Sequence, residues 1–208
     1  MSLKDERSPE AEKKLLAKLN EIEFLRLRNI RPIYLFSVDS TQSYIASEVK
    51  DPREGDLVIA ETQTEGRGRK GKTWVSQKGG LWMSITLKPE DPRVLQDIPI
   101  VATSSVLNSL VSLGLAECNI KPPNDVHYRG KKIAGVLADT IVEGTRSTVY
   151  LGIGVNVNND TTEIESISEI ATSVKKELGR ETDLNQFTVS LLKNLDWAYD
   201  RAYSSLLV

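Results

Sequence analysis

The sequence predicts an α+β fold in which a mixed, largely antiparallel sheet is flanked by helices. Short runs rich in β-branched and aromatic residues alternate irregularly with helical segments, which disfavours a regular doubly wound sheet. Two of these runs, 133–139 and 147–155, are separated by a short connection and should pair as an antiparallel hairpin. The chain has 208 residues, so it can bury a core without a metal or a disulfide.

The first predicted element is a helix. Ser8 and Pro9 form a helix start, a cap followed by a first-turn proline, and apolar residues at helical spacing continue to about Asn29. A segment of this length is too short for a winged-helix DNA-binding domain, which needs several helices. We therefore interpret residues 1–30 as an N-terminal helical extension that docks on a single domain formed by residues 31–208.

The remaining elements follow from residue type and periodicity. Strands are expected at 32–38, 56–62, 81–87, 133–139 and 147–155, and helices near 39–49, 99–114, 163–178 and 183–206. The helix near 39–49 should be capped at Asp39 or Ser40. The helix at 99–114 is apolar on almost every side, which predicts that it is buried and that Gly114 ends it.

Composition argues against several functional classes. A formal net charge of −2 and a pI of about 5.6 give no global attraction to nucleic acid, and no apolar run is long enough to span a membrane. His127 is the only histidine, which disfavours a zinc site and a nucleophile activated by histidine. Cys118 is the only cysteine, which we interpret as a small buried residue in a reducing, cytoplasmic setting. We expect neither nucleic acid nor a membrane as a partner.

A basic, glycine-rich loop follows the second predicted strand. Residues 66–73 read GRGRKGKT, a literal match to the P-loop pattern. A P-loop needs a helix to begin at Lys72 and Thr73, but two glycines and a strand follow instead. The loop could also be a nucleic-acid patch or a solvated charged turn. The glycines make the loop flexible, and the arginines supply planar guanidinium groups that donate hydrogen bonds to anions. This combination favours a loop that becomes ordered when it binds an anionic ligand.

Two later segments place polar residues and glycines in or beside strands. Lys132 stands at the entrance of an apolar strand, where its ammonium can meet an anion, and Gly135 indicates close approach by a ligand or another backbone. Gly152 belongs to LGIGVNVN, which lacks the third glycine of the dinucleotide fingerprint, so a β-bulge is the simpler explanation. Asn156 follows it and could hydrogen-bond a base or a ribose.

Taken together and in this order, the motifs resemble the catalytic domain of biotin protein ligases. The matching segments cover roughly residues 31–160 and are DSTQS, Q-x-x-G-R-G-R-x-G with Trp74, GGLWMSI, K-x-P-N-D, K-[IL]-A-G-[IV]-L and G-x-G-[IV]-N-[VM]. The resemblance implies a reaction in two steps. Biotin's carboxylate attacks the α-phosphate of ATP to give biotinyl-5′-AMP and pyrophosphate, and a lysine of a biotin carboxyl carrier protein then takes the biotin as an amide.

The resemblance also assigns roles to residues. Arg69 and Lys132 would be catalytic, offsetting the negative charge that gathers when a carboxylate meets a polyphosphate. Biotin would be bound by Ser40, Thr41, Gln63, Gly66, Arg67, Gly135 and Gly152. The nucleotide would be bound by Trp74, Asn124 and Asn156. No metal ligands are expected in the protein, because Mg²⁺ would travel on the ATP phosphates. The loop at 65–73 should order over the intermediate.

Two departures from the family pattern bear on the expected partners. Pro122 replaces the tryptophan of K-W-P-N-D, and no strands follow the last predicted helix. We therefore expect neither a C-terminal β-barrel domain nor an N-terminal DNA-binding domain, and a separate protein could supply the barrel. Exposed strand edges, together with the resemblance, favour a homodimer.

Three other functions compete with the ligase. A lipoate or octanoate ligase or transferase of the same fold would need no partners for a ureido ring, so Ser40, Thr41 and Gln63 favour biotin. A biotin or biotinyl-AMP binding protein without transfer would fail to label a carrier. A P-loop NTPase would turn over ATP without biotin and depend on Lys72.

Overall fold

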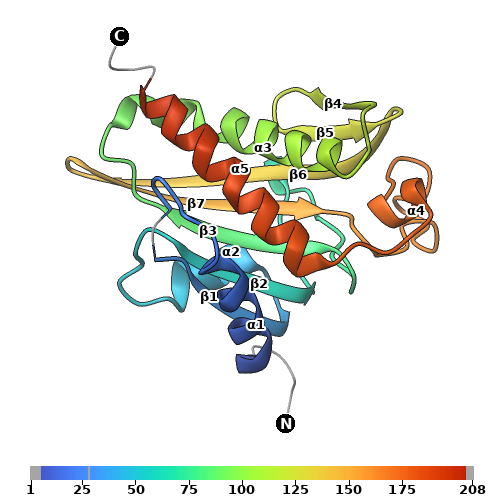
Figure 1. Cartoon of the computed structure of the whole chain (residues 1–208), viewed down its shortest axis with the longest axis horizontal. Coiled ribbons are helices and arrows are strands. Elements are labelled where there is room, and N and C mark those ends of the chain that lie inside the picture. Colours follow the sequence, from blue (N-terminus) through green and yellow to red (C-terminus); the bar gives the residue numbers. More distant parts are fainter. Residues whose placement is uncertain (1–5, 28, 205–208) are drawn as a thin grey trace.

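A computed structural model describes residues 6–27 and 29–204 (Figure 1). In this part of the chain seven strands form one mixed sheet in the order β1-β2-β3-β7-β6-β5-β4. They are β1 (Arg31–Val38), β2 (Asp56–Gln63), β3 (Leu81–Leu87), β4 (Cys118–Lys121), β5 (Asp125–Tyr128), β6 (Lys131–Glu143) and β7 (Arg146–Val155). β1 and β2 run parallel, and the other neighbouring strands run antiparallel. The predicted α+β fold and the β6–β7 hairpin are confirmed.

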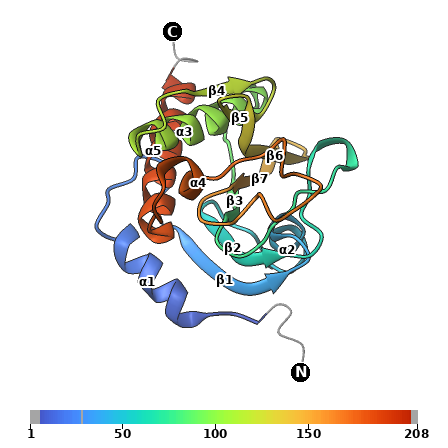
Figure 2. The same cartoon turned by 90° about the vertical axis from the view of Figure 1, so that its right-hand side faces the viewer.

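Helices cover the two faces of the sheet unequally (Figure 2). α3 (Ile98–Ser112) and α5 (Leu184–Ser204) lie on one face with α1 (Pro9–Leu19) beside them, and the main core lies between these helices and the sheet. α2 (Thr41–Ser47) lies on the other face over a smaller apolar cluster. α2 covers only part of that face (Figure 2). No helix in the described residues is long and apolar enough to cross a membrane.

The N-terminal helix docks on the domain but is shorter than predicted. Leu15 and Leu19 are buried in the main core, and α1 ends at Leu19 instead of continuing to about Asn29. The N–H groups of residues 20–22 close the last turn on carbonyls of residues 16, 18 and 19, and beyond them the backbone has other acceptors. The N–H groups of residues 25–27 all bond to the buried carboxylate of Asp196 on α5. Residues 25–27 thus bond to α5 where the sequence pattern had suggested that the helix continues.

The helix predicted near 163–178 is wrong over most of its length. Only α4 (Val174–Leu178) is helical, and the residues before it lie against β6. There the backbone N–H of Lys132 donates to the carbonyl of Ile170 at 2.8 Å, and the N–H of Thr172 donates to the carbonyl of Lys132 at 2.9 Å. These hydrogen bonds occupy backbone N–H and carbonyl groups that a helix would have paired internally.

Two further predictions need correction. α3 is not buried on every side, since Ile100 and Val111 face solvent, although it does end just before Gly114. The strands β4 and β5 were not predicted, because each spans only four residues and polar side chains alternate along them. Cys118 begins β4 and is half-buried. Burial, and after it the nearby Glu177 carboxylate, raise the pKa of its thiol to about 11, which keeps the thiol protonated.

Candidate functional site

A cavity of about 610 Å³ lies on the face of the sheet that carries α2. Its walls come from the start of α2, the basic loop after β2, the β4–β5 turn, the middle of β6 and β7, and the segment before α4. Every candidate site residue from the sequence lines this cavity except Gly66. The fold thus gathers into one site residues that are more than a hundred positions apart in the chain, such as Ser40 and Asn156.

Small residues form the floor of the cavity. Gly135 of β6 pairs with Gly154 of β7, and Gly152 pairs with Ser84 of β3. The indole of Trp74 lies directly over two of these glycines. A Cβ on Gly135 would come within 3.0 Å of the ring, and a Cβ on Gly154 within 2.7 Å. The glycines therefore make room for the tryptophan. This explains why β6 and β7, in the middle of the sheet, have glycine at these two positions.

Gly154→Val is expected to push Trp74 off the floor of the cavity and to cost about 1–3 kcal/mol of stability by overpacking. Acrylamide quenching of tryptophan fluorescence checks this, because a displaced indole becomes more accessible. The added quenching should vanish when Trp74→Phe is combined with Gly154→Val. Thr148→Val, on the same strand but remote from the cavity lining, is the control. Unchanged quenching and unchanged stability in Gly154→Val would contradict the packing described.

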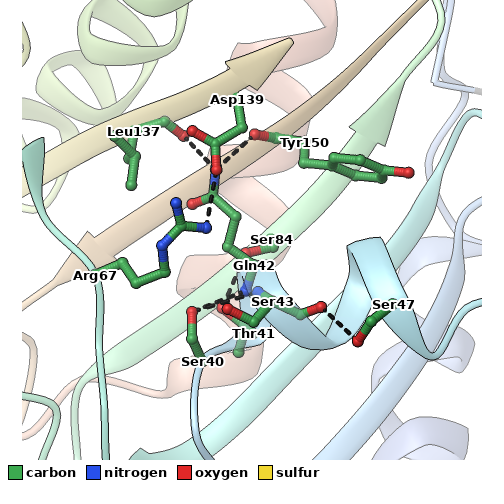
Figure 3. Close-up of polar contacts among 10 residues, drawn as sticks. All are labelled: Ser40, Thr41, Gln42, Ser43, Ser47, Arg67, Ser84, Leu137, Asp139 and Tyr150. Atoms are coloured by element: carbon green, nitrogen blue, oxygen red, sulfur yellow. Dashed lines mark hydrogen bonds and ion pairs between the residues drawn. The ribbon is translucent and has the colours of Figure 1, made fainter. Parts of the chain in front are cut away.

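One end of the cavity is built from neutral hydrogen-bonding groups. The Oε1 atom of Gln63 accepts from the backbone N–H and the hydroxyl of Thr41, at 2.8 and 3.1 Å, and its Nε2 donates to the Ser76 hydroxyl at 2.7 Å. The hydroxyls of Thr41 and Ser84 lie 2.9 Å apart (Figure 3). These contacts fix which way the Gln63 amide points. Ser84, a lone serine in an apolar strand, was not singled out in the sequence.

The start of α2 is anchored to the sheet beside these groups (Figure 3). The Ser40 hydroxyl oxygen accepts from the backbone N–H groups of residues 42 and 43, which confirms the predicted cap and leaves its hydrogen free for another acceptor. Gln42, which sequence reasoning did not assign to the site, donates its Nε2 to the Tyr150 carbonyl at 2.9 Å. Its Oε1 occupies the space above Gly152, where a Cβ would lie 2.4 Å away. Gly152 therefore makes room for Gln42.

A β-bulge brings Lys132 to the other end of the cavity. The register between β5 and β6 shifts by one residue, so that Val126 pairs with Ala134 while His127 pairs with Lys132. Ile133 is the extra residue, and both it and Ala134 are buried in the core. Without the bulge, the alternation along β6 would point Lys132 to the core face. This placement could not be read from the sequence.

The ammonium of Lys132 has two neighbours within the protein. Its Nζ lies 2.7 Å from Oδ1 of Asp125 and 4.8 Å from the ring centre of Trp74. Lys132 and Asp125 are both about one-third exposed, so water screens the pair and an incoming anion can replace the carboxylate at small cost. Asp125 belongs to the K-x-P-N-D motif, where sequence reasoning had treated it only as part of a turn.

The two arginines of the basic loop are also held by acceptors in the protein. Arg67 pairs with Asp139 on β6 at 2.9 Å (Figure 3), and Arg69 donates to Oδ1 of Asn124 at 3.3 Å. Asn124 is fixed in turn, because its amide nitrogen donates to the carbonyl of Val136. The loop therefore lies across the cavity with its guanidinium groups in place.

The rest of the loop does not form a P-loop. Residues 69–71 make a single 3-10 turn, and in the described chain no helix begins at Lys72. Thr73 instead pairs back with Arg67, and the N–H of Trp74 donates to the Gly66 carbonyl at 2.7 Å. Gly66 lies outside the lining because the loop's own backbone packs against it. A Cβ on Gly66 would come within 2.3 Å of the Trp74 carbonyl oxygen.

Asn156 lies at the end of β7 with its amide oriented by a neighbour. Its Oδ1 accepts from the side-chain amide of Asn159 at 3.1 Å, which leaves its own NH₂ group as a donor. In the described residues the buried indole N–H of Trp74 has no hydrogen-bond partner. The NH₂ group of Asn156 is thus available to a ligand, whereas the indole N–H of Trp74 is buried against Gly154. No group of three or more histidine, cysteine, aspartate or glutamate side chains in the described chain is placed to hold a metal ion.

Comparison with known proteins identifies similar sequences and a similar structure. The profile of the Biotin/lipoate A/B protein ligase family matches residues 34–156. The bifunctional ligase/repressor BirA of Bacillus spizizenii is 37% identical over 159 residues, which is 73% of this chain and 48% of that protein. The biotin–[acetyl-CoA-carboxylase] ligase of Mycobacterium tuberculosis is 34% identical over 69% of this chain and 53% of its own length. The chain thus spans about half the length of these curated relatives.

Among solved structures, a biotin protein ligase from Aquifex aeolicus in complex with biotin and ATP is similar to this one. It aligns with a TM-score of 0.71 and 34% sequence identity, covering 82% of this chain and 70% of that one. The family match itself runs from within β1 to the residue after β7.

Proposed function

Because this chain belongs to the biotin/lipoate A/B protein ligase family, we propose that it activates biotin with ATP and transfers it to a lysine of a biotin carboxyl carrier protein. The observation that carries the proposal is the division of one cavity into a neutral hydrogen-bonding end and a cationic end. A molecule with a polar, uncharged ring and a carboxylate at the end of a short chain matches both.

The neutral end suits the ureido ring of biotin. The free hydroxyl hydrogen of Ser40 can donate to the ureido carbonyl, while Thr41, Gln63 and Ser84 surround the ring with fixed donors and acceptors. Gln42 and Gly152 shape the adjoining wall. A saturated acyl chain offers no acceptor to the free hydroxyl hydrogen of Ser40, which disfavours octanoate as the substrate.

The cationic end suits the joining of a carboxylate to a phosphate. Arg69 and Lys132 exchange Asn124 and Asp125 for ligand oxygens and offset the charge that gathers as biotin's carboxylate attacks the α-phosphate. The new bond joins a carboxylate oxygen to phosphorus, and pyrophosphate leaves with the electron pair of the broken P–O bond. Mg²⁺ enters on the phosphates of ATP, and Arg67 keeps the loop across the site through Asp139.

The nucleotide occupies the region of Trp74, Asn124 and Asn156. The free NH₂ group of Asn156 supplies a donor for ring nitrogens or ribose oxygens, and the buried indole N–H of Trp74 becomes a second donor once its loop moves. Because Trp74 lies on the glycine floor, the loop that carries it has to shift when biotin and ATP enter. The same loop then covers the mixed anhydride and keeps water away from it.

Partners and location are also proposals. β6 pairs with β5 only as far as Gly135 and Val136 bonds to Asn124, so residues 138–143 present an edge on which Ile141 and Val142 are exposed. This edge supports a homodimer by strand pairing. A biotin carboxyl carrier protein is the proposed acceptor. The single cysteine supports a cytoplasmic location.

Pyrophosphate release tests the proposed function and its closest rival together. The protein is incubated with ATP and Mg²⁺ alone, and then with biotin, lipoate or octanoate. Release that requires biotin supports the proposal. Release that is fastest with lipoate or octanoate would assign the chain to the other branch of the family. Release without any acid would point to an NTPase, and activation of biotin without labelling of a carrier domain would point to a protein that binds but does not transfer.

Arg69→Ala is expected to slow biotin-dependent pyrophosphate release by about 10²-fold or more, because one fixed cation is removed from the developing charge. Lys72→Ala is the matched control. It removes a cation from the same loop, and Lys72 matches a P-loop lysine in sequence but not in structure. We expect the rate of pyrophosphate release to change by less than about threefold, because the side chain is exposed and an exposed charge contributes little. Equal losses in the two variants would contradict the assignment.

A further inference from the structure

His127 lies in the cavity but has no role in the activation of biotin described above. It is the only histidine in the chain, it is 8% exposed, and it lines the same cavity as Lys132. The β-bulge makes these two residues direct neighbours across β5 and β6. In such a pair the Cβ atoms are about 5 Å apart, so the imidazole lies beside the cation that binds the acyl phosphate in the proposed function.

The hydrogen bonding of His127 decides what its ring can do. Its Nδ1 lies 3.0 Å from the carbonyl oxygen of Gly130, in the turn between β5 and β6. A carbonyl oxygen only accepts, so Nδ1 carries the hydrogen in the neutral ring and Nε2 is left with a lone pair. In the described part of the chain no group donates to Nε2. The turn thus holds an imidazole in the tautomer that a proton acceptor needs.

The second half of the proposed reaction requires such an acceptor. A carrier lysine attacks as an amine, and its nitrogen has to lose a proton as the amide forms. The ionisable side chains that line the cavity are Arg67, Arg69, Lys70, Lys72, Lys121, Asp125, His127 and Lys132. The lysines and arginines are cations without a lone pair to offer. Asp125 pairs with Lys132 at 2.7 Å, whereas Nε2 of His127 has no donor in the described residues, so His127 is the acceptor in the lining that keeps an unused lone pair.

We propose that His127 is a catalytic residue of the transfer step and takes the proton from the incoming amine. The amine nitrogen forms a bond to the acyl carbon, the bond between that carbon and the bridging oxygen breaks, and AMP leaves with the electron pair. Nε2 of His127 accepts the proton of the nitrogen and passes it to water. This inference rests on the proposed function but concerns only its second step, so the two can be tested separately.

The experiment measures the two half-reactions one at a time in His127→Gln and His127→Ala. Activation is followed as biotin-dependent pyrophosphate release. Transfer is followed from synthetic biotinyl-5′-AMP to a purified bacterial biotin carboxyl carrier domain, so that it can be measured whatever happens to activation. We expect activation within about twofold of the parent and transfer slower by about 10²-fold, the usual contribution of a positioned base. Added imidazole should restore transfer in His127→Ala.

Asn119→Ala is the control for local disturbance. Asn119 is the other cross-strand neighbour of His127, on β4, and is exposed outside the cavity. We expect both half-reactions to be unchanged in this variant. Transfer that stays intact in His127→Gln would overturn the inference. So would an equal loss of activation and transfer, or a His127→Ala variant that imidazole does not rescue, since each indicates a structural or nucleotide-binding role. A parent protein that transfers biotin from the synthetic intermediate but never makes it would overturn the proposed activation alone.

Discussion

Lys132→Ala is expected to lower biotin-dependent pyrophosphate release by about 10²–10³-fold, which is the effect of removing one fixed group that stabilises developing charge. The bulge between β5 and β6 points this lysine into the cavity, where Asp125 and Trp74 hold its ammonium. In the parent protein the carboxylate is replaced by the ligand's oxygens as charge gathers on them. Without the ammonium, two anions have to meet with Arg69 as the main remaining cation.

Lys131→Ala is the matched control for this prediction. Lys131 is the preceding residue of β6 and does not line the cavity. Its loss removes the same charge from the chain and should change the rate by less than about twofold, as expected for a partly exposed charge outside the site. Steady-state rates and the thermal midpoint of both variants are needed, because Lys132→Ala has to remain folded. A folded Lys132→Ala protein with the parent's rate would show that the bulge does not serve the chemistry.

Asp196→Ala is expected to cost about 3 kcal/mol of folding free energy, which makes it the largest stability effect we predict. The carboxylate is 3% exposed and accepts hydrogen bonds from the backbone N–H groups of Leu25, Arg26 and Leu27 at 2.6, 2.8 and 2.6 Å. Alanine leaves these donors without their acceptor and frees the segment between α1 and β1 from α5. For a chain of this size the thermal midpoint should fall by about 6–12 °C.

Asp200→Ala on the same helix provides the comparison. Asp200 is one turn further along α5 and pairs with the side chain of Arg26 at 2.9 Å, where both partners are about one-third exposed. Exposed pairs of this kind contribute less than about 1 kcal/mol. Denaturant unfolding of the parent and the two variants checks the difference. If Asp196→Ala and Asp200→Ala unfold at the same denaturant concentration, the three backbone contacts do not anchor the segment as described.

Local residue patterns were sufficient to predict much of this fold. The strands at 56–62 and 81–87 follow from runs of β-branched and aromatic residues, and the cap at Ser40 follows from its hydroxyl at the start of α2. Where predictions failed, a distant part of the chain forms hydrogen bonds with the backbone groups that the predicted helix would have used. Asp196 holds the backbone N–H groups of residues 25–27, where the first helix was expected to continue, and β6 pairs with residues 170–172 in place of a helix.

The site was predictable as a set of residues but not as an arrangement. Ordered motifs pointed to Arg69, Lys132 and Gln63, and these do line one cavity. The bulge that directs Lys132, and the glycine floor that receives Trp74, depend on the register between strands, which no single segment encodes. Asp125 was overlooked as a partner for the same reason, because it contacts Lys132 only after β5 and β6 have paired.

The product formed from ATP labelled at the α-phosphate tests the central claim most directly. The protein is incubated with labelled ATP, Mg²⁺ and biotin, quenched, and the labelled species is identified by mass. The account predicts biotinyl-5′-AMP, formed only when biotin is present and retained by the protein until an amine acceptor is added. Label recovered as ADP, or as an adenylate of octanoate or lipoate in preference to biotin, would contradict it.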